Sequence, residues 1–234
     1  MTRAALVRGV PESDDPGCDI PLAAWNNPIP PDELKLASQV FGPNRSQLIT
    51  GAAFTDTAVQ NDPSLDNFRI IHFATHGLVA APKAGCPAKP ALLTSFGGQG
   101  SDGLLEFGDI FDLKLDADLV ILSACNTASQ AGLEATQQAG IDGGGGQALD
   151  GLVRAFIGAG GRQVIASHWP APEEYGATKR LFEGLFESPP GESLGVALLN
   201  AQRKLMDDPE TSHPFYWSGF ALIGDGERPL IPSS

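Results

Sequence analysis

The stretch ADLVILSAC, residues 117–125, decides the fold because its centre predicts a strand that is buried on both faces. Leu119–Leu122 is continuously apolar and includes β-branched residues, which is typical of a central strand in a parallel sheet. The strand runs into Cys125, and a polar turn follows. Reactive groups gather at the carboxyl ends of the strands in open parallel sheets, so Cys125 is the first candidate site residue.

Two further stretches predict the neighbours of this strand. FRIIHFATHG (68–77) and QVIASHW (163–169) have the same apolar, β-branched character. Helices and strands alternate along the chain, which indicates an α/β fold with a mostly parallel sheet covered on both faces by helices. The predicted helices are 30–42, 55–61 with Thr55 as its cap, 105–115, 147–161, 173–188 and 193–208, and the further predicted strands are 4–10, 46–51, 91–95 and 215–224.

Composition and charge restrict the possible functions. With 234 residues and 42% hydrophobic content, residues 1–234 are expected to form a single domain, in which 1–20 is an irregular or edge segment. The net charge of −13 argues against binding to nucleic acid or to a membrane surface, and it favours a partner or substrate that carries Arg or Lys. The apolar runs are too short for a signal peptide or a membrane span, so we expect a cytoplasmic protein.

The three cysteines do not predict a disulfide framework or a metal site. Cys18, Cys86 and Cys125 are odd in number and include no CxxC pair, and His, Asp and Glu do not cluster at the spacing of metal ligands. The glycine-rich GIDGGGGQALDG (140–151) lacks the Gly-Lys-Ser/Thr ending of a phosphate loop. No cofactor and no metal are therefore expected, and residues 126–146 are predicted to form a long flexible segment.

A histidine ends the strand expected to lie beside the cysteine strand. His76 lies 49 residues before Cys125, and parallel neighbouring strands would bring both residues to the same sheet edge. A thiol needs a neighbouring base or imidazolium to react near neutral pH, and histidine is the usual partner. A lone cysteine at a strand end is more often a small hydrophobe, so the pairing with His76 carries the prediction. We expect His72, within the strand, to be a hydrogen-bonded core residue, and His213 to be structural.

Four motifs follow in family order and give the sequence a specific resemblance. HFATHG (72–77), LVILSACNT (119–127), LVRAFIGAGGRQVIASHWP (152–170) and HPFYWSGFALIG (213–224) resemble the successive motifs of CHAT domains, and the similarity runs from about residue 20 to 226. CHAT domains are caspase-like cysteine peptidase domains related to separases, and they often follow tetratricopeptide repeats. The resemblance implies a caspase–hemoglobinase-like three-layer sandwich in a bacterial protein.

The resemblance also implies site residues and a reaction. His76 corresponds to the catalytic histidine and Cys125 to the nucleophile, while the backbone N–H groups of Gly77 and Cys125 would form the oxyanion hole. Ser167, His168 and Trp169 correspond to a strand that lines the substrate pocket in related peptidases. The chain is thus expected to be a cysteine endopeptidase that acts on a protein or peptide substrate.

The sequence departs from the family pattern in three places, of which the first two bear on substrate preference rather than on the chemistry and the third suggests a mobile active-site loop. Ala128 and Ser129 follow Cys-Asn-Thr where the family commonly has Gly, the segment after Trp-Pro offers Glu173 and Glu174 in place of Asp, and the glycine-rich stretch is long. The acidic balance and the kinship with separases favour cleavage after Arg or Lys, with Glu173, Glu174 or Asp142 as candidates for the pocket charge. The alternative is a latent or non-catalytic signalling module that a sensor or a tetratricopeptide-repeat partner activates.

Overall fold

The computed structural model describes residues 29–78, 90–97, 100–123, 144–169 and 174–232, and for residues 144–150 it describes the backbone course alone. Two sheets are present in this part of the chain. The central sheet has the order β1-β5-β6-β7, and the smaller sheet has the order β2-β3-β4. The strands are β1 (Ile70–Ala74), β2 (Gly77–Leu78), β3 (Ala91–Leu93), β4 (Leu104–Glu106), β5 (Leu119–Ser123), β6 (Val164–Ser167) and β7 (Phe220–Ile223).

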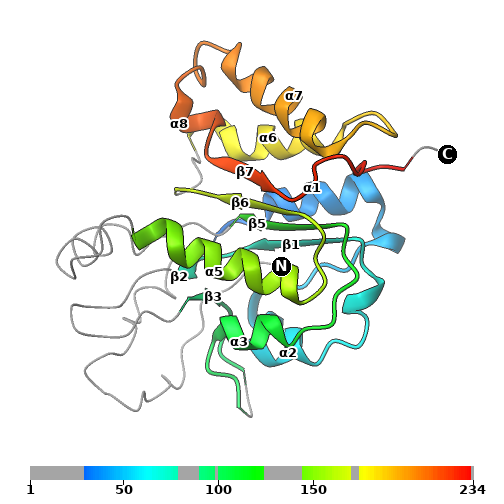
Figure 1. The fold of residues 1–234 in the computed structure, drawn as a ribbon, viewed down its shortest axis with the longest axis vertical. Coiled ribbons are helices and arrows are strands. Elements are labelled where there is room, and N and C mark those ends of the chain that lie inside the picture. The colour runs from blue at the N-terminus through cyan, green and yellow to red at the C-terminus, as the bar shows by residue number, and fades with distance from the viewer. Residues whose placement is uncertain (1–28, 79–89, 98–99, 124–143, 170–173, 233–234) are drawn as a thin grey trace.

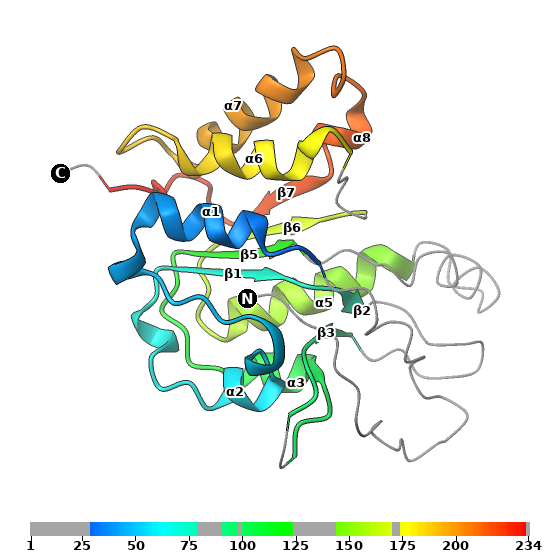
Figure 2. The ribbon, with the colours of Figure 1, turned by 180° about the vertical axis from the view of Figure 1, so that it is seen from behind.

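Helices cover both faces of the central sheet (Figure 1). The helices α3 and α5 lie on one face, while α1, α6 and α7 lie on the other, as the view from behind also shows (Figure 2). The helices are α1 (Asp32–Phe41), α2 (Asp56–Gln60), α3 (Phe107–Phe111), α5 (Gly144–Gly158), α6 (Ala177–Phe186), α7 (Leu194–Met206) and α8 (Pro214–Trp217). The prediction of a mostly parallel sheet between two helical layers is confirmed.

The three strands predicted to be buried form the parallel part of the central sheet. β1 pairs with β5 in parallel, with Ile70 opposite Leu119 and Ala74 opposite Ser123, and β5 pairs with β6 in parallel. β7 runs antiparallel to β6. The carboxyl ends of β1, β5 and β6 consequently meet at one edge of the sheet, which is where sites form in open α/β folds.

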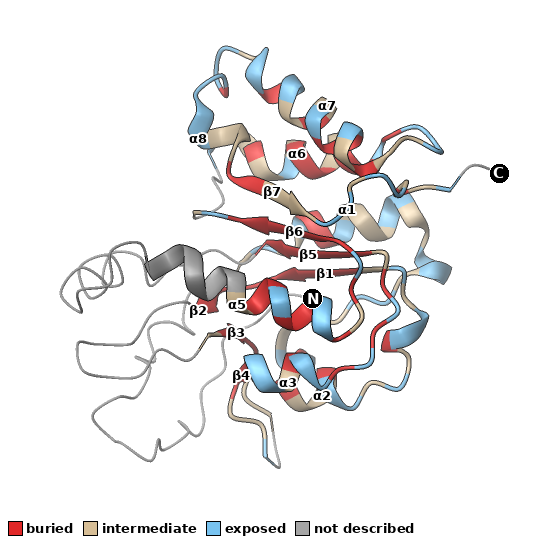
Figure 3. Cartoon of the chain, viewed as in Figure 1, coloured by how far each residue is buried: buried red, intermediate tan, exposed pale blue. Residues whose placement is uncertain are grey.

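Alternation along the strands divides the core into two clusters. Phe73, Val120 and Leu122 face α5, whose Leu152, Val153 and Phe156 are buried against them. On the opposite face Leu119, Ile121 and Ile165 pack against apolar side chains of α6 and α7, namely Leu181, Phe182, Leu185, Phe186, Leu194 and Leu198. Figure 3 shows the central strands as the most continuously buried part of the fold. Burial of each large side chain contributes about 1.5–3 kcal/mol, so the packing of helices on both faces of this sheet stabilises the fold.

Several predicted elements differ from the structure. Residues 46–49 form no strand, Thr50 forms an isolated bridge, and Gly51–Ala53 is a short 3-10 helix. The predicted helix 105–115 begins as strand β4 and is helical over α3 alone, and the predicted strand 215–224 begins as helix α8. α5 includes Gly144–Gly146, so the flexible segment predicted for 126–146 is wrong at its end. The predicted strand 4–10, the segment 1–20 and residues 126–143 lie outside the described residues.

The structure confirms two local predictions, the helix cap at Thr55 and the short strand within residues 91–95. Thr55 caps α2, because its Oγ1 accepts a hydrogen bond of 3.0 Å from the Ala58 N–H. The candidate strand 91–95 is present as β3, whose side chains are fully buried. The two-residue strand β2 was not predicted, because a pair of residues carries no periodicity.

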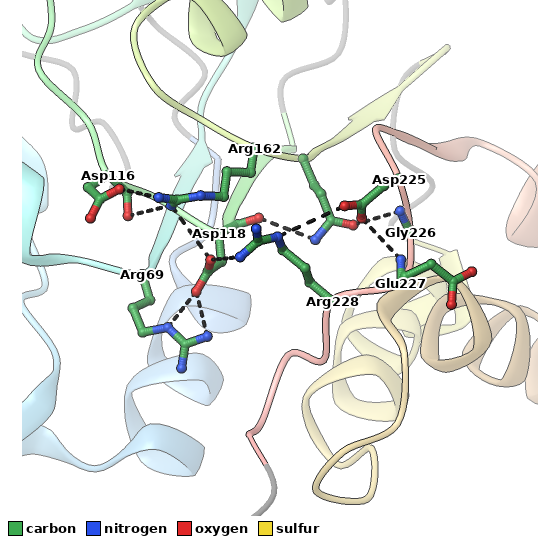
Figure 4. A network of polar contacts seen from close by, with 9 residues as sticks. Arg69, Asp116, Asp118, Arg162, Asp225, Gly226, Glu227 and Arg228 are labelled. Atoms are coloured by element: carbon green, nitrogen blue, oxygen red, sulfur yellow. Dashed lines mark hydrogen bonds and ion pairs between the residues drawn. The ribbon is translucent and has the colours of Figure 1, made fainter.

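Three arginines surround Asp118 (Figure 4). They lie at the amino-terminal edge of the parallel strands, opposite the edge where β1, β5 and β6 end. Arg69, Arg162 and Arg228 converge on the carboxylate of Asp118, at 2.5, 3.6 and 3.4 Å respectively. Arg162 also pairs with Asp116. Arg69 precedes β1, Arg162 precedes β6, and Arg228 follows β7. The carboxylate of Asp118 therefore forms ion pairs with three segments that are distant in the sequence. The guanidinium of Arg162 has a raised pKa because of its hydrogen bond to Asp116.

Candidate functional site

His76 and Gly77 lie where β1 gives way to the small sheet. The Leu93 N–H donates a 2.8 Å hydrogen bond to the His76 carbonyl oxygen, and the Thr75 hydroxyl donates one of 2.5 Å to the Leu93 carbonyl oxygen. These two bonds hold the backbone just after β1 against the end of β3. His76 is buried, with 3% of its surface exposed, and so is Gly77.

The register of the small sheet fixes the direction of the Gly77 N–H. Gly77 lies opposite Leu92 in an antiparallel pair, and the neighbouring pair of His76 and Leu93 is hydrogen bonded. Hydrogen-bonded and non-hydrogen-bonded pairs alternate in antiparallel ladders, so Gly77 and Leu92 form a non-hydrogen-bonded pair. The Gly77 N–H therefore points away from β3 and does not take part in that ladder.

The segment at the end of β6 contributes three predicted pocket residues at the same sheet edge. Ser167 is buried, and its hydroxyl donates a 3.3 Å hydrogen bond to the Leu122 carbonyl oxygen of β5. His168 is exposed, and its backbone N–H donates to Gly219 at 2.8 Å. The Trp169 indole N–H donates to the Phe215 carbonyl oxygen at 3.0 Å. The backbone after β6 is thereby fastened both to β5 and to the segment before β7.

Aromatic side chains continue from Trp169 toward α8. The Trp169 ring stacks on Phe215, the Phe215 ring meets Tyr216 edge to face, and Tyr216 meets Tyr175 edge to face. Tyr175 is 56% exposed and has a φ of 54°, which is uncommon for a residue with a side chain. Glu174, the described one of the two predicted acidic pocket residues, is the exposed neighbour of Tyr175. Sequence reasoning missed this aromatic cluster, because its members lie on separate segments.

Three predicted residues lie outside the part of the chain that the structure describes. They are Cys125, Glu173 and Asp142. Of the predicted site residues that the structure describes, His76 and Gly77 follow β1, and the Ser167–Trp169 segment ends β6, at the same carboxyl edge of the parallel strands. In the sequence, Cys125 follows the last residue of β5 by two positions, as His76 follows the last residue of β1 by two positions.

A sizeable groove in the described part of the molecule lies at a different place. A groove of about 740 Å³ runs beside α1 and the amino-terminal half of β1, and its lining includes Leu34, Leu48, Ile70, His72 and Phe186. His76 and Ser167 do not line it. We assign the candidate site by strand ends rather than by cavity size, because a reaction needs reactive groups and this groove is mainly apolar.

His72 is a buried core residue, as the sequence predicted. Its Nε2 lies 3.4 Å from Oε1 of Glu33, a buried carboxylate on α1. Its ring packs against Phe182 and Phe186 of α6, with centroid distances of 5.0 and 6.2 Å. Burial lowers the pKa of His72, and the neighbouring Glu33 carboxylate partly opposes this effect.

The lowered pKa of His72 predicts a dependence of stability on pH. A folded-state pKa below the unfolded value of about 6.5 means that the unfolded chain binds the proton more readily, so stability falls as pH decreases below that value. The expected slope is up to about 1.4 kcal/mol per pH unit for one such group. Urea unfolding of wild type and His72→Gln at pH 7.5, 6.5 and 5.5 measures it. Parallel pH dependence in the two proteins would contradict this assignment.

The described residues show neither a candidate metal centre nor a transmembrane segment. No group of three or more His, Cys, Asp or Glu side chains is arranged to hold a metal ion within the described ranges. In the same residues no helix has the length and apolar character needed to cross a membrane.

Comparison with known proteins adds a family and two relatives. The family model described as the CHAT domain matches residues 1–225. The chain is 28% identical over 239 aligned positions to human tetratricopeptide repeat protein 28, covering 88% of this chain and 9% of that protein. It is 33% identical over 133 positions to the mouse protein of the same name, covering 56% of this chain and 5% of that protein. The chain thus spans at most about a tenth of the length of these curated relatives.

Proposed function

Because this chain belongs to the CHAT domain family, within the caspase-like cysteine peptidase superfamily, we propose that it is a cysteine endopeptidase with a His76–Cys125 dyad. The observation that carries the proposal is the register of β1 and β5. Ala74 and Ser123 are opposite each other at the ends of these parallel strands, and each dyad residue follows its strand end by two positions. The carboxyl ends of β1 and β5 share one edge of the sheet, and this supports the proposal that the two residues that follow them in the sequence act together.

The proposed reaction uses these groups in two steps. The Cys125 thiolate attacks the scissile carbonyl carbon, the carbon–nitrogen bond breaks, and His76 gives a proton to the leaving amine. Water then hydrolyses the thioester and regenerates the thiol. The Gly77 N–H is a suitable oxyanion donor because the small sheet directs it away from β3. A donor of this kind contributes about 3 kcal/mol in other hydrolases.

The proposed substrate has Arg or Lys before the scissile bond. The net charge of −13 and the exposed Glu174, seven positions after the last residue of β6, support this preference, and Glu173 and Asp142 are further candidates for the pocket charge. The substrate would be a protein in the cytoplasm, and nucleic acid and membrane surfaces are not proposed as partners, because an acidic surface repels both.

A positional-scanning fluorogenic peptide library tests this function. The wild-type protein is expected to cleave peptides with Arg or Lys at P1, while peptides with Asp at P1 remain intact. The Cys125→Ala protein, assayed at the same concentration, is the control for contaminating peptidases. A preference for Asp at P1 would contradict the proposed specificity, and equal cleavage by the Cys125→Ala protein would contradict the dyad.

The second candidate function is a latent signalling module that needs a partner. The relatives support it, because a protein named for tetratricopeptide repeats contains the matched region as a small fraction of its length. A tetratricopeptide-repeat or sensor protein would be the activating partner. Cleavage by the isolated chain excludes this candidate, whereas cleavage that appears after such a partner is added supports it.

A further inference from the structure

Three buried polar side chains from three elements meet between the central sheet and α6. Glu33 comes from the first turn of α1, His72 from the middle of β1, and Ser123 from the end of β5. They are 8%, 9% and 4% exposed, respectively. His72 and Ser123 share the sheet face that carries Leu119 and Ile121, because His72 lies opposite Ile121 and Ser123 lies two residues further on.

The Glu33 carboxylate joins the two strands. The Ser123 hydroxyl donates a 3.2 Å hydrogen bond to Oε2, and Nε2 of His72 lies 3.4 Å from Oε1. Each carboxylate oxygen therefore faces a different strand. Glu33 of α1 thus contacts both the middle of β1 and the last residue of β5. These residues are far apart in the sequence, so no local sequence pattern predicts the contacts.

Stability alone does not account for this cluster. The rings of Phe182 and Phe186 pack on His72, so the carboxylate and the imidazole lie next to an apolar layer. Burial of a charged or polar group costs several kcal/mol unless its partners compensate, and apolar side chains of similar volume often stabilise such sites equally or better. The cluster is therefore better explained by the orientation that the hydrogen bond from Ser123 to Glu33 imposes on the end of β5.

We propose that the Glu33–His72–Ser123 cluster positions the carboxyl end of β5 for the reaction, with Ser123 as a positioning residue for the nucleophile. Ser123 is the last residue of β5 and precedes Cys125 by two positions in the sequence, so the hydrogen bond from Ser123 to Glu33 holds the end of the strand that leads to the candidate nucleophile. This inference rests on the proposed function, since Cys125 is the nucleophile in it. The hydroxyl does not touch substrate, and its effect passes through the strand.

Removal of one hydroxyl group tests the proposal. Ser123→Ala deletes the donor with little change in volume, and Ser123→Thr restores a hydroxyl on a residue that suits a strand. A misplacement of about 1 Å costs up to about 100-fold in rate, so we expect Ser123→Ala to lower kcat by about 10–100-fold with KM within about twofold. Ser123→Thr is expected to recover most of the loss. Ser188→Ala, at a buried serine that follows α6, is the matched control and is expected to keep kcat unchanged.

A second measurement separates this proposal from the peptidase assignment. In a Cys18→Ser, Cys86→Ser background, the rate of iodoacetamide alkylation reports on Cys125 without any peptide substrate. We expect Ser123→Ala to change this rate by about fivefold or more relative to Ser188→Ala, in line with a displaced thiol. An unchanged alkylation rate together with an unchanged kcat would overturn the positioning role, even if the thermal midpoint falls. Absence of peptide cleavage by wild type would overturn the proposed function, and the alkylation rates would still decide this inference.

Discussion

Replacement of Cys125 by alanine is expected to lower kcat/KM for a basic peptide by about 10⁴-fold or more, because the variant lacks the atom that attacks the carbonyl carbon. His76→Ala is expected to lower it by about 10³-fold, since the leaving amine then has no positioned proton donor. Initial rates with a fluorogenic Arg or Lys peptide measure both effects.

The double variant provides the control for this prediction. Residues that act as a unit are strongly non-additive, so the Cys125→Ala/His76→Ala protein is expected to be no slower than Cys125→Ala alone. The far-ultraviolet circular dichroism spectrum of each variant should match that of the wild type. The thermal midpoint of each variant should lie within a few degrees of the wild-type midpoint. Retention of more than about a tenth of the wild-type rate in Cys125→Ala would remove Cys125 from the mechanism.

The largest effect on stability is expected at Gly160. This residue has a φ of 112°, and a Cβ atom added there would overlap the carbonyl oxygen of Leu115. The Leu115 N–H donates a 2.8 Å hydrogen bond to Ala159, so the two backbone segments cannot separate without losing this bond. Gly160→Ala is expected to lower the free energy of unfolding by about 3 kcal/mol or more, from strain in φ and from the overlap.

Gly42→Ala separates the strain in φ from the steric overlap of the added Cβ atom. Gly42 has a φ of 90°, yet a Cβ atom added there would have no neighbour within 4 Å. The free energy of unfolding of this variant should therefore fall only by the cost of the strained φ, about 1 kcal/mol. Urea unfolding at pH 7.5 measures both variants. Equal losses for Gly160→Ala and Gly42→Ala would show that the close approach of residues 115 and 160 contributes nothing.

The sequence predicted the parts of the fold that carry a strong local signal. The β1, β5 and β6 strands are mainly apolar and rich in β-branched residues, and the Thr55 cap follows from a single residue with a known local preference. β2, β4 and α8 were missed or misassigned because elements of two to four residues carry too little periodicity. Residues 46–51 have the composition of a strand, but the structure has a 3-10 helix at Gly51–Ala53.

The sequence could predict only those candidate site residues that directly follow a buried strand. His76 was found because it follows a buried strand, and the structure places it, buried, at the predicted sheet edge. The Glu33–Ser123 hydrogen bond and the three arginines around Asp118 join residues that are 44 to 110 positions apart. Such pairs depend on which segments the fold brings together, and single-sequence patterns do not contain that information.

The most direct test of the central claim is the site of labelling by a peptidyl acyloxymethyl ketone with Arg at P1. Such a probe traps the thiolate that attacks a carbonyl, and the chain offers three cysteines, Cys18, Cys86 and Cys125, as internal competitors. Peptide mapping by mass spectrometry after brief exposure is expected to find the label on Cys125 alone in wild type, and on no cysteine in His76→Ala. Comparable labelling of all three cysteines, or labelling of Cys18 or Cys86 in place of Cys125, would contradict the proposed peptidase.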